Sequence, residues 1–137
     1  MKYLRPMCLV SALVCAPAYA ADAVPTFKSG EYQVTTSFGD SQTMSDKVCL
    51  TDYADWFGTL QDKVAERGCA LRAEGQTGAV FRYQMTCSNG ANGRMAVTRV
   101  TDSHFESVTE ITIPIAGFEQ TISTRDSAVR LGDCPPE

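Results

Sequence analysis

The sequence predicts a mainly β domain, an antiparallel sheet or partial barrel of about six to seven strands, with one α-helix packed on one face and two disulfides. Apolar and polar residues alternate along most of the chain beyond residue 30, which is the period of a half-buried strand. Residues 52–67 have their apolar residues at helical spacing instead. Cysteines are spread widely over this part of the chain, and in an exported protein such cysteines indicate disulfides.

The N-terminus has the three parts of a secretory signal. A positively charged start precedes a short apolar run at residues 7–15, and Ala18-Tyr19-Ala20 forms a small-x-small cleavage site. We therefore expect a signal peptide over residues 1–20. Residues 21–137 then form a single disulfide-bonded β domain.

Two observations argue against a membrane anchor. The apolar run is much shorter than the ~20 residues that a spanning helix needs. Lipidation of Cys15 is the alternative, but Val14 is larger than the residue that usually precedes a lipidated cysteine. We expect a periplasmic or secreted protein, with no membrane insertion after signal cleavage.

The mature chain is acidic. The formal net charge is −4, and loss of the signal removes the positive charges of Lys2 and Arg5, which changes it to −6. Nucleic acids and anionic membrane surfaces attract basic proteins, because lysine and arginine supply most of that affinity. The charge therefore argues against a nucleic acid or an anionic membrane as partner.

The first strands form a predicted hairpin. Residues 31–38 alternate, with Tyr32 and Val34 on one face. Gly39-Asp40-Ser41 has the chemistry of a turn, and residues 42–50 are typical of the returning strand.

The helix follows this hairpin. Thr51 is a suitable N-cap, and Asp52 and Asp55 place negative charge at the positive end of the helix dipole. Gly68 stands where a C-terminal glycine cap belongs. The apolar stripe, which needs a sheet to cover it, consists of Tyr53, Trp56, Phe57, Leu60 and Val64.

The two strands after the helix predict a disulfide. If Leu71 lies opposite Met85, the apolar residues of both strands share one face, and Cys69 lies opposite Cys87. The four cysteines of the mature chain allow three pairings. This register favours Cys69–Cys87 and Cys49–Cys134.

The remaining sequence predicts further strands and their connections. Residues 88–93 are typical of a connection, and residues 114–117 interrupt the strand pattern. The expected strand segments are residues 94–101, 105–113, 118–124 and 128–131.

Several short motifs in this order resemble a bacterial exported family called domain of unknown function 3617. They are Ser29-Gly30-Glu31-Tyr32-Gln33-Val34-Thr35-Thr36, Val48-Cys49-Leu50-Thr51, Gly68-Cys69, Met85-Thr86-Cys87 and Arg130-Leu131-Gly132-Asp133-Cys134. The family often has Trp where this chain has Tyr32. The resemblance covers residues 27–134 and implies a cell-envelope location, four disulfide-bonded cysteines and no established activity. It supplies no catalytic residue.

The residues that could take part in catalysis or metal binding are better explained as parts of turns and disulfides. His104 stands alone beside a turn signal, so neither a multi-histidine metal site nor a catalytic triad is expected. Gly39-Asp40-Ser41 is similar to an esterase nucleophile block, but a turn is favoured because it lies between two strand patterns. The cysteines lack the C-x-x-C spacing of zinc or redox sites. We expect no catalytic residue, no metal and no cofactor.

The carboxylates Asp52, Asp55, Asp62, Glu66, Glu106 and Glu110 are expected on solvated faces. Trp56 and Phe57 are candidate contacts for a ligand or partner, since large aromatic residues dominate binding hot spots. Both also belong to the helix stripe, and a place in the core is favoured.

These observations predict a non-catalytic binding or accessory protein of the cell envelope, whose partner is an envelope protein or a small apolar ligand. A groove between helix and sheet would support this hypothesis. The alternative is an inhibitor of an envelope hydrolase, a lysozyme or a protease, that inserts residues 88–93 or 114–117. A small hydrolase built on His104 is a third, disfavoured hypothesis.

Overall fold

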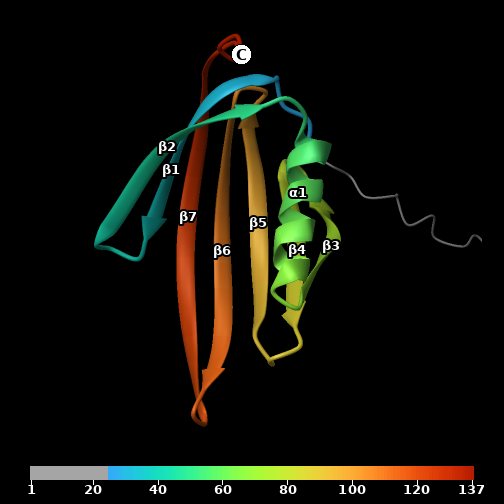
Figure 1. Cartoon of the computed structure of the whole chain (residues 1–137), viewed down its shortest axis with the longest axis vertical. Coiled ribbons are helices and arrows are strands. Elements are labelled where there is room, and N and C mark those ends of the chain that lie inside the picture. Colours follow the sequence, from blue (N-terminus) through green and yellow to red (C-terminus); the bar gives the residue numbers. More distant parts are fainter. Residues whose placement is uncertain (1–24) are drawn as a thin grey trace, which may run out of the picture.

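The computed structural model describes residues 25–137, without the side chains of residues 53–56, and forms one seven-stranded antiparallel sheet with one helix (Figure 1). The elements are β1 (Gly30–Phe38), β2 (Gln42–Leu50), α1 (Tyr53–Glu66), β3 (Cys69–Thr77), β4 (Val80–Cys87), β5 (Asn92–Thr101), β6 (His104–Ile115) and β7 (Phe118–Gly132). The predicted fold class is confirmed. The predicted signal peptide, residues 1–20, lies outside the described residues.

The sheet has the order β2-β1-β7-β6-β5-β4-β3, so the strands on either side of α1 in sequence are the two edges of the sheet. The chain therefore has to pass from one edge to the other, and α1 lies within this connection, alongside β4 and β3 over one face (Figure 1). A glycine with φ of +75°, Gly68, ends the helix as predicted, and its N–H donates to the Ala65 carbonyl at 2.9 Å.

The predicted pairing of β3 with β4 is confirmed. Leu71 lies opposite Met85, and Cys69 lies opposite Cys87. Both predicted disulfides, Cys69–Cys87 and Cys49–Cys134, are present. Each lies close to an end of α1 in sequence, so the crossing segment is tied to the sheet on both sides.

Two strands extend further than the sequence pattern predicts. β6 continues through Pro114 to Ile115. β5 begins at Asn92, opposite Thr112, so the rest of β6 has no neighbour on that side. Proline is tolerated at such an edge because its missing N–H costs no hydrogen bond there. β7 is one strand across residues 125–127, because these residues pair with β1 on one side and β6 on the other. Pairing on both sides outweighs the polar interruption of the pattern.

The buried core has two parts on the same face of the sheet. One consists of Tyr32, Leu50 and Ala128, and the other of Phe81, Tyr83 and Val97. The half-buried Phe105 packs against both. α1 covers the second part, with the Phe57 ring centroid 4.8 Å from that of Tyr83.

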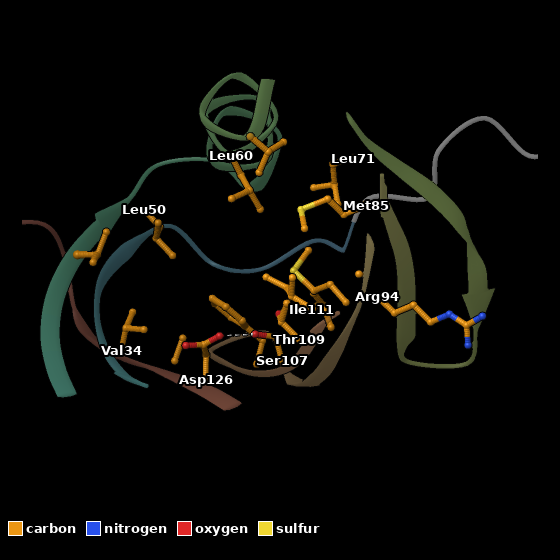
Figure 2. Close-up of a pocket in the computed structure, with 17 residues that line it drawn as sticks. Val34, Leu50, Leu60, Leu71, Met85, Arg94, Ser107, Thr109, Ile111 and Asp126 are labelled. Carbon is orange, nitrogen blue, oxygen red and sulfur yellow. Dashed lines mark hydrogen bonds between the residues drawn. The ribbon is translucent and has the colours of Figure 1, made fainter. Parts of the chain in front are cut away.

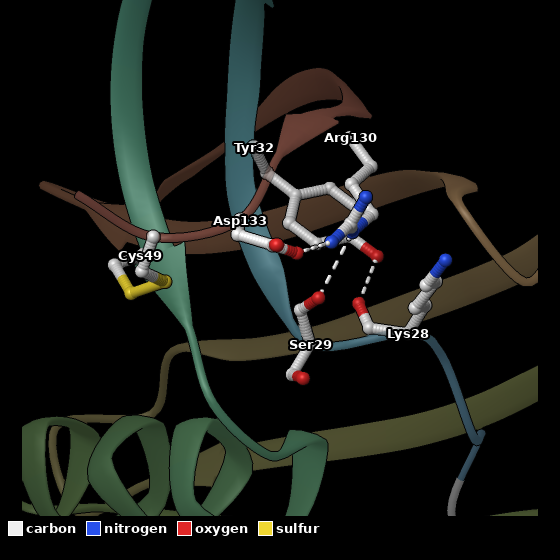
Figure 3. The surroundings of a disulfide bond; sticks show 7 residues. Lys28, Ser29, Tyr32, Cys49, Arg130 and Asp133 are labelled. Carbon is white, nitrogen blue, oxygen red and sulfur yellow. Dashed lines mark hydrogen bonds and ion pairs between the residues drawn. A yellow bond between two sulfur atoms is a disulfide. The ribbon is translucent and has the colours of Figure 1, made fainter.

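A polar cluster closes one end of the sheet beside Cys49–Cys134 (Figure 3). The fully buried Tyr32 donates its hydroxyl to the Lys28 carbonyl. Burial is the main cause that raises the pKa of Tyr32 above its ordinary value, so the phenol remains a donor to a higher pH than an exposed tyrosine would. Arg130 donates to the Ser29 carbonyl at 2.9 Å and forms an ion pair with Asp133. This cluster holds the segment before β1 against the end of β7.

Removal of either disulfide should destabilise the fold, and removal of the disulfide that closes the longer loop should cost more free energy of unfolding. The paired cysteines are 18 residues apart in Cys69–Cys87 and 85 apart in Cys49–Cys134. Replacing both cysteines of a pair by serine should lower the free energy of unfolding by about 3 kcal/mol for the first pair and about 4–5 kcal/mol for the second. Guanidinium unfolding followed by circular dichroism measures both values. A larger loss from the shorter loop would contradict the loop-length argument.

Gly30 should not tolerate a side chain, whereas Gly132 should. Gly30 has φ of +154°, and a Cβ there would overlap the Gly132 carbonyl oxygen and the Arg130 guanidinium. A Cβ on Gly132 meets nothing within 4 Å. In urea unfolding, Gly30→Ala should cost about 2 kcal/mol or more, and Gly132→Ala should stay within about 0.5 kcal/mol of the unsubstituted protein. Equal losses would show that the close approach at Gly30 does not restrain the fold.

Candidate functional site

An apolar cavity of about 360 Å³ lies between α1 and the concave face of the sheet (Figure 2). This volume falls in the range of small-molecule sites, about 300–1,000 Å³. The helix contributes Leu60 and Val64 to its wall. The strands contribute mostly apolar residues, among them Val34, Val48, Leu50, Leu71, Met85, Met95, Val97, Phe105 and Ile111.

The cavity exists because part of α1 packs against the half of the sheet that contains β4, while the rest of its apolar stripe borders open volume. Phe57 seats the helix against Tyr83 and the core cluster formed with Phe81 and Val97. Later residues of the same stripe, Leu60 and Val64, line the cavity. Figure 2 shows Leu60 pointing from the helix into it. The predicted apolar stripe is thus divided between a packed part and a part that borders open volume.

The apolar surface continues beyond the cavity along the β6–β7 hairpin, which extends past the other strands (Figure 1). Ile111 lines the cavity, and strand alternation places Ile113 and Ile115 on the same face. Across the register, Ile111 pairs with Ile122, and Ile115 pairs with Phe118. Ile115 is 50% exposed and Phe118 is 79% exposed. These residues form an exposed apolar strip, interrupted by Gln120 opposite Ile113, that leads from the cavity toward the hairpin tip.

The floor of the cavity carries one polar cluster on three neighbouring strands. Asp126 on β7 lies opposite Thr36 on β1 and opposite Ser107 on β6. The Thr36 hydroxyl donates to Asp126 Oδ1 at 2.5 Å, and the Ser107 hydroxyl donates to Oδ2 at 3.0 Å. Both Asp126 and Ser107 line the cavity. The carboxylate is therefore held in place from both sides.

Arg94 also borders the cavity, but its charge lies elsewhere. Figure 2 shows its side chain pointing away from the cavity, and the residue is exposed. Of the side chains that line the cavity and point into it, Asp126 alone carries a formal charge among the residues that the structure describes.

Sequence reasoning missed this cluster. Residues 125–127 fall in the predicted gap between two strand segments, so no face could be assigned to Asp126. Once β7 is seen to be continuous, the alternation from Ala128 places Asp126 on the concave face. The only sequence signal was a polar residue at a position where a continuous strand would point inward.

His104 begins β6 and lies on the face opposite to the cavity-lining Phe105. Its Nε2 lies 3.4 Å from Glu106 Oε1 and 3.3 Å from Ser127 Oγ. A serine–histidine–carboxylate relay needs its two partners on different ring nitrogens. Both partners here meet the same nitrogen, so this cluster lacks the geometry of the relay.

The other candidate residues do not gather into a site. Gly39-Asp40-Ser41 forms the β1–β2 turn, as predicted. Phe57 is half-buried against Tyr83, and the side chain of Trp56 is outside the described residues. Within residues 25–137, no group of three or more His, Cys, Asp or Glu side chains could hold a metal ion. Over the same residues, no helix has the length and apolar character to span a membrane.

Comparison with curated proteins and with solved structures gives no match. A family model described as "Protein of unknown function (DUF3617)" matches residues 27–134. This match spans all seven strands, the helix and the four disulfide-bonded cysteines. The chain therefore belongs to the DUF3617 family of proteins of unknown function.

Proposed function

We propose that the protein is a non-catalytic binding protein of the cell envelope that holds a small apolar molecule in the cavity beneath α1. The cavity itself supports this proposal most strongly. Its walls are mostly apolar side chains from the helix and from both halves of the sheet, and its volume suits a small molecule. Each methylene group that such a ligand buries contributes about 0.8 kcal/mol.

The arrangement of the walls also fits a binding site. Apolar residues of the strip on β6 and β7 remain exposed, so a long apolar ligand can extend from the cavity toward Phe118. Contiguous exposed apolar surface of this kind marks binding surfaces in other proteins. The two disulfides are compatible with an oxidising compartment, which supports a periplasmic place of action.

Binding of the neutral apolar dye N-phenyl-1-naphthylamine tests this function. We expect its fluorescence to rise on addition of the oxidised protein and to saturate, because the cavity removes the dye from water. Long-chain alcohols should displace it. A fluorescence change no larger than that with an unrelated disulfide-bonded protein would contradict the proposal.

A matched pair of substitutions on β6 locates the dye. Thr109 lines the cavity, whereas Val108 points to the other face of the sheet. Thr109→Phe should fill the cavity and weaken dye binding by at least about ten-fold, a change of roughly 1.4 kcal/mol. Val108→Phe should leave dye affinity unchanged. Equal effects of the two variants would place the dye outside the cavity.

Inhibition of an envelope hydrolase is the second candidate function, and the β6–β7 tip favours it. Ala116 and Gly117 form a tight turn at the end of the two longest strands, and Phe118 projects beside it. A rigid tip loses little conformational freedom on insertion into a partner's cleft.

Assays against purified lysozymes and proteases test this second candidate. Inhibition of one of them should fall at least about ten-fold in Phe118→Ala if the tip enters the cleft, since exposed aromatic residues dominate such contacts. Ile122→Ala, further from the tip on β7, serves as the matched control. No inhibition by the unsubstituted protein would contradict this function.

A further inference from the structure

We propose that the cavity selects a single-chain amphiphile with a cationic head, a protonated amine, and that Asp126 is the residue that binds this head. This inference rests on the proposed function, because it names the ligand class of the same site. The argument depends on the geometry of Asp126, on its lack of a neighbouring cation and on the apolar walls around it.

The carboxylate of Asp126 is oriented but not saturated. Thr36 donates to one of its oxygens and Ser107 donates to the other. An ionised carboxylate has about four lone-pair sites, so these two bonds leave acceptor capacity on both oxygens. Because the donors come from the strands on either side of β7, they hold the carboxylate on the concave face.

The charge of Asp126 lacks a counter-charge among the described residues. Asp126 belongs to neither of the ion pairs His104–Glu106 and Arg130–Asp133. Arg94 points away from the cavity (Figure 2), and Arg125 lies on the other face of β7 and is exposed. The hydrogen bonds from two hydroxyl groups offset only part of the free energy that a half-buried carboxylate loses when it leaves water.

An ammonium head supplies both missing features. It has three donors and no acceptor, so it can use the free lone pairs of Asp126 and neutralise its charge. A carboxylate or phosphate head would instead bring a second negative charge into an apolar cavity, where like charges repel strongly. A hydroxyl head would form a hydrogen bond without neutralising the charge.

The walls determine the rest of the ligand. Met95, Leu60 and Val34 line the same cavity as Asp126 and have no polar side-chain group to bind a second head group. An alkyl chain therefore fills the cavity, and a longer chain continues along the exposed apolar strip past Ile111. The combination of one anionic anchor and apolar walls fits an alkyl amine.

Competition among amphiphiles of equal chain length tests the inference. Dodecylamine, dodecanol and dodecanoate, below their micelle-forming concentrations and at neutral pH, compete with N-phenyl-1-naphthylamine for the protein. We expect dodecylamine to displace the dye at a concentration at least about ten-fold lower than dodecanol, as charge-assisted hydrogen bonds are the stronger ones. Dodecanoate should be the weakest competitor.

Two substitutions then assign the preference to one carboxylate. Asp126→Asn keeps the shape of the side chain and should bring dodecylamine and dodecanol to equal potency. Glu110→Gln removes the same charge from an exposed position on the other face of β6, and it should keep the preference for the amine. The preference of the unsubstituted protein for dodecylamine over dodecanol can be measured even if a substituted protein fails to fold.

The outcomes separate this inference from the proposed function. If the dye binds and the three amphiphiles displace it equally, or if Asp126→Asn retains the preference, the cationic-head inference is wrong while an apolar binding function stands. If the dye does not bind at all, both are wrong. Loss of the preference in Glu110→Gln would assign it to overall charge and would also overturn the role of Asp126.

Discussion

The crossing of α1 from one edge of the sheet to the other is the constraint on which the rest of the structure depends. β2 and β3 are the two edge strands, yet they are joined by a single helix. Antiparallel strands elsewhere in the chain are joined by tight turns, so this crossing is the one long connection in the described sheet. In this protein the helix lies over the concave face of the curved sheet and covers the cavity there.

The disulfides hold the helix and its connections to the sheet at both ends. Cys49–Cys134 ties the β2 end of the crossing to the segment after β7, and Cys69–Cys87 ties the β3 end to β4. Between these points, Phe57 of α1 packs against Tyr83, whereas Leu60 and Val64 border the cavity. A crosslinked crossing can remain in place over a cavity that its own side chains do not fill. The covalent links therefore help to maintain an unfilled cavity in a chain whose buried core is small.

Unfilled apolar volume has an energetic consequence for this fold. The atoms that line the cavity lack partners on one side and lose the dispersion attraction that a packed core provides. A ligand that fits the cavity restores these contacts, and a ligand that binds only the folded state stabilises it by mass action. Ligand binding and fold stability are then linked, with Asp126 as a polar point in an otherwise apolar surface.

By itself, the sequence determined the local elements and much of their pairing. Alternation located the strands, the apolar stripe located α1, and the positions of Leu71 and Met85 predicted the register that brings Cys69 to Cys87. These predictions succeed because they depend on short-range patterns and on neighbouring strands. Only the tertiary structure decided the strand order, the continuity of β7 and the volume left beneath α1. Asp126 shows the reason: its face is set by pairing with β1, which lies about 90 residues earlier in the chain, and no local pattern carries that information.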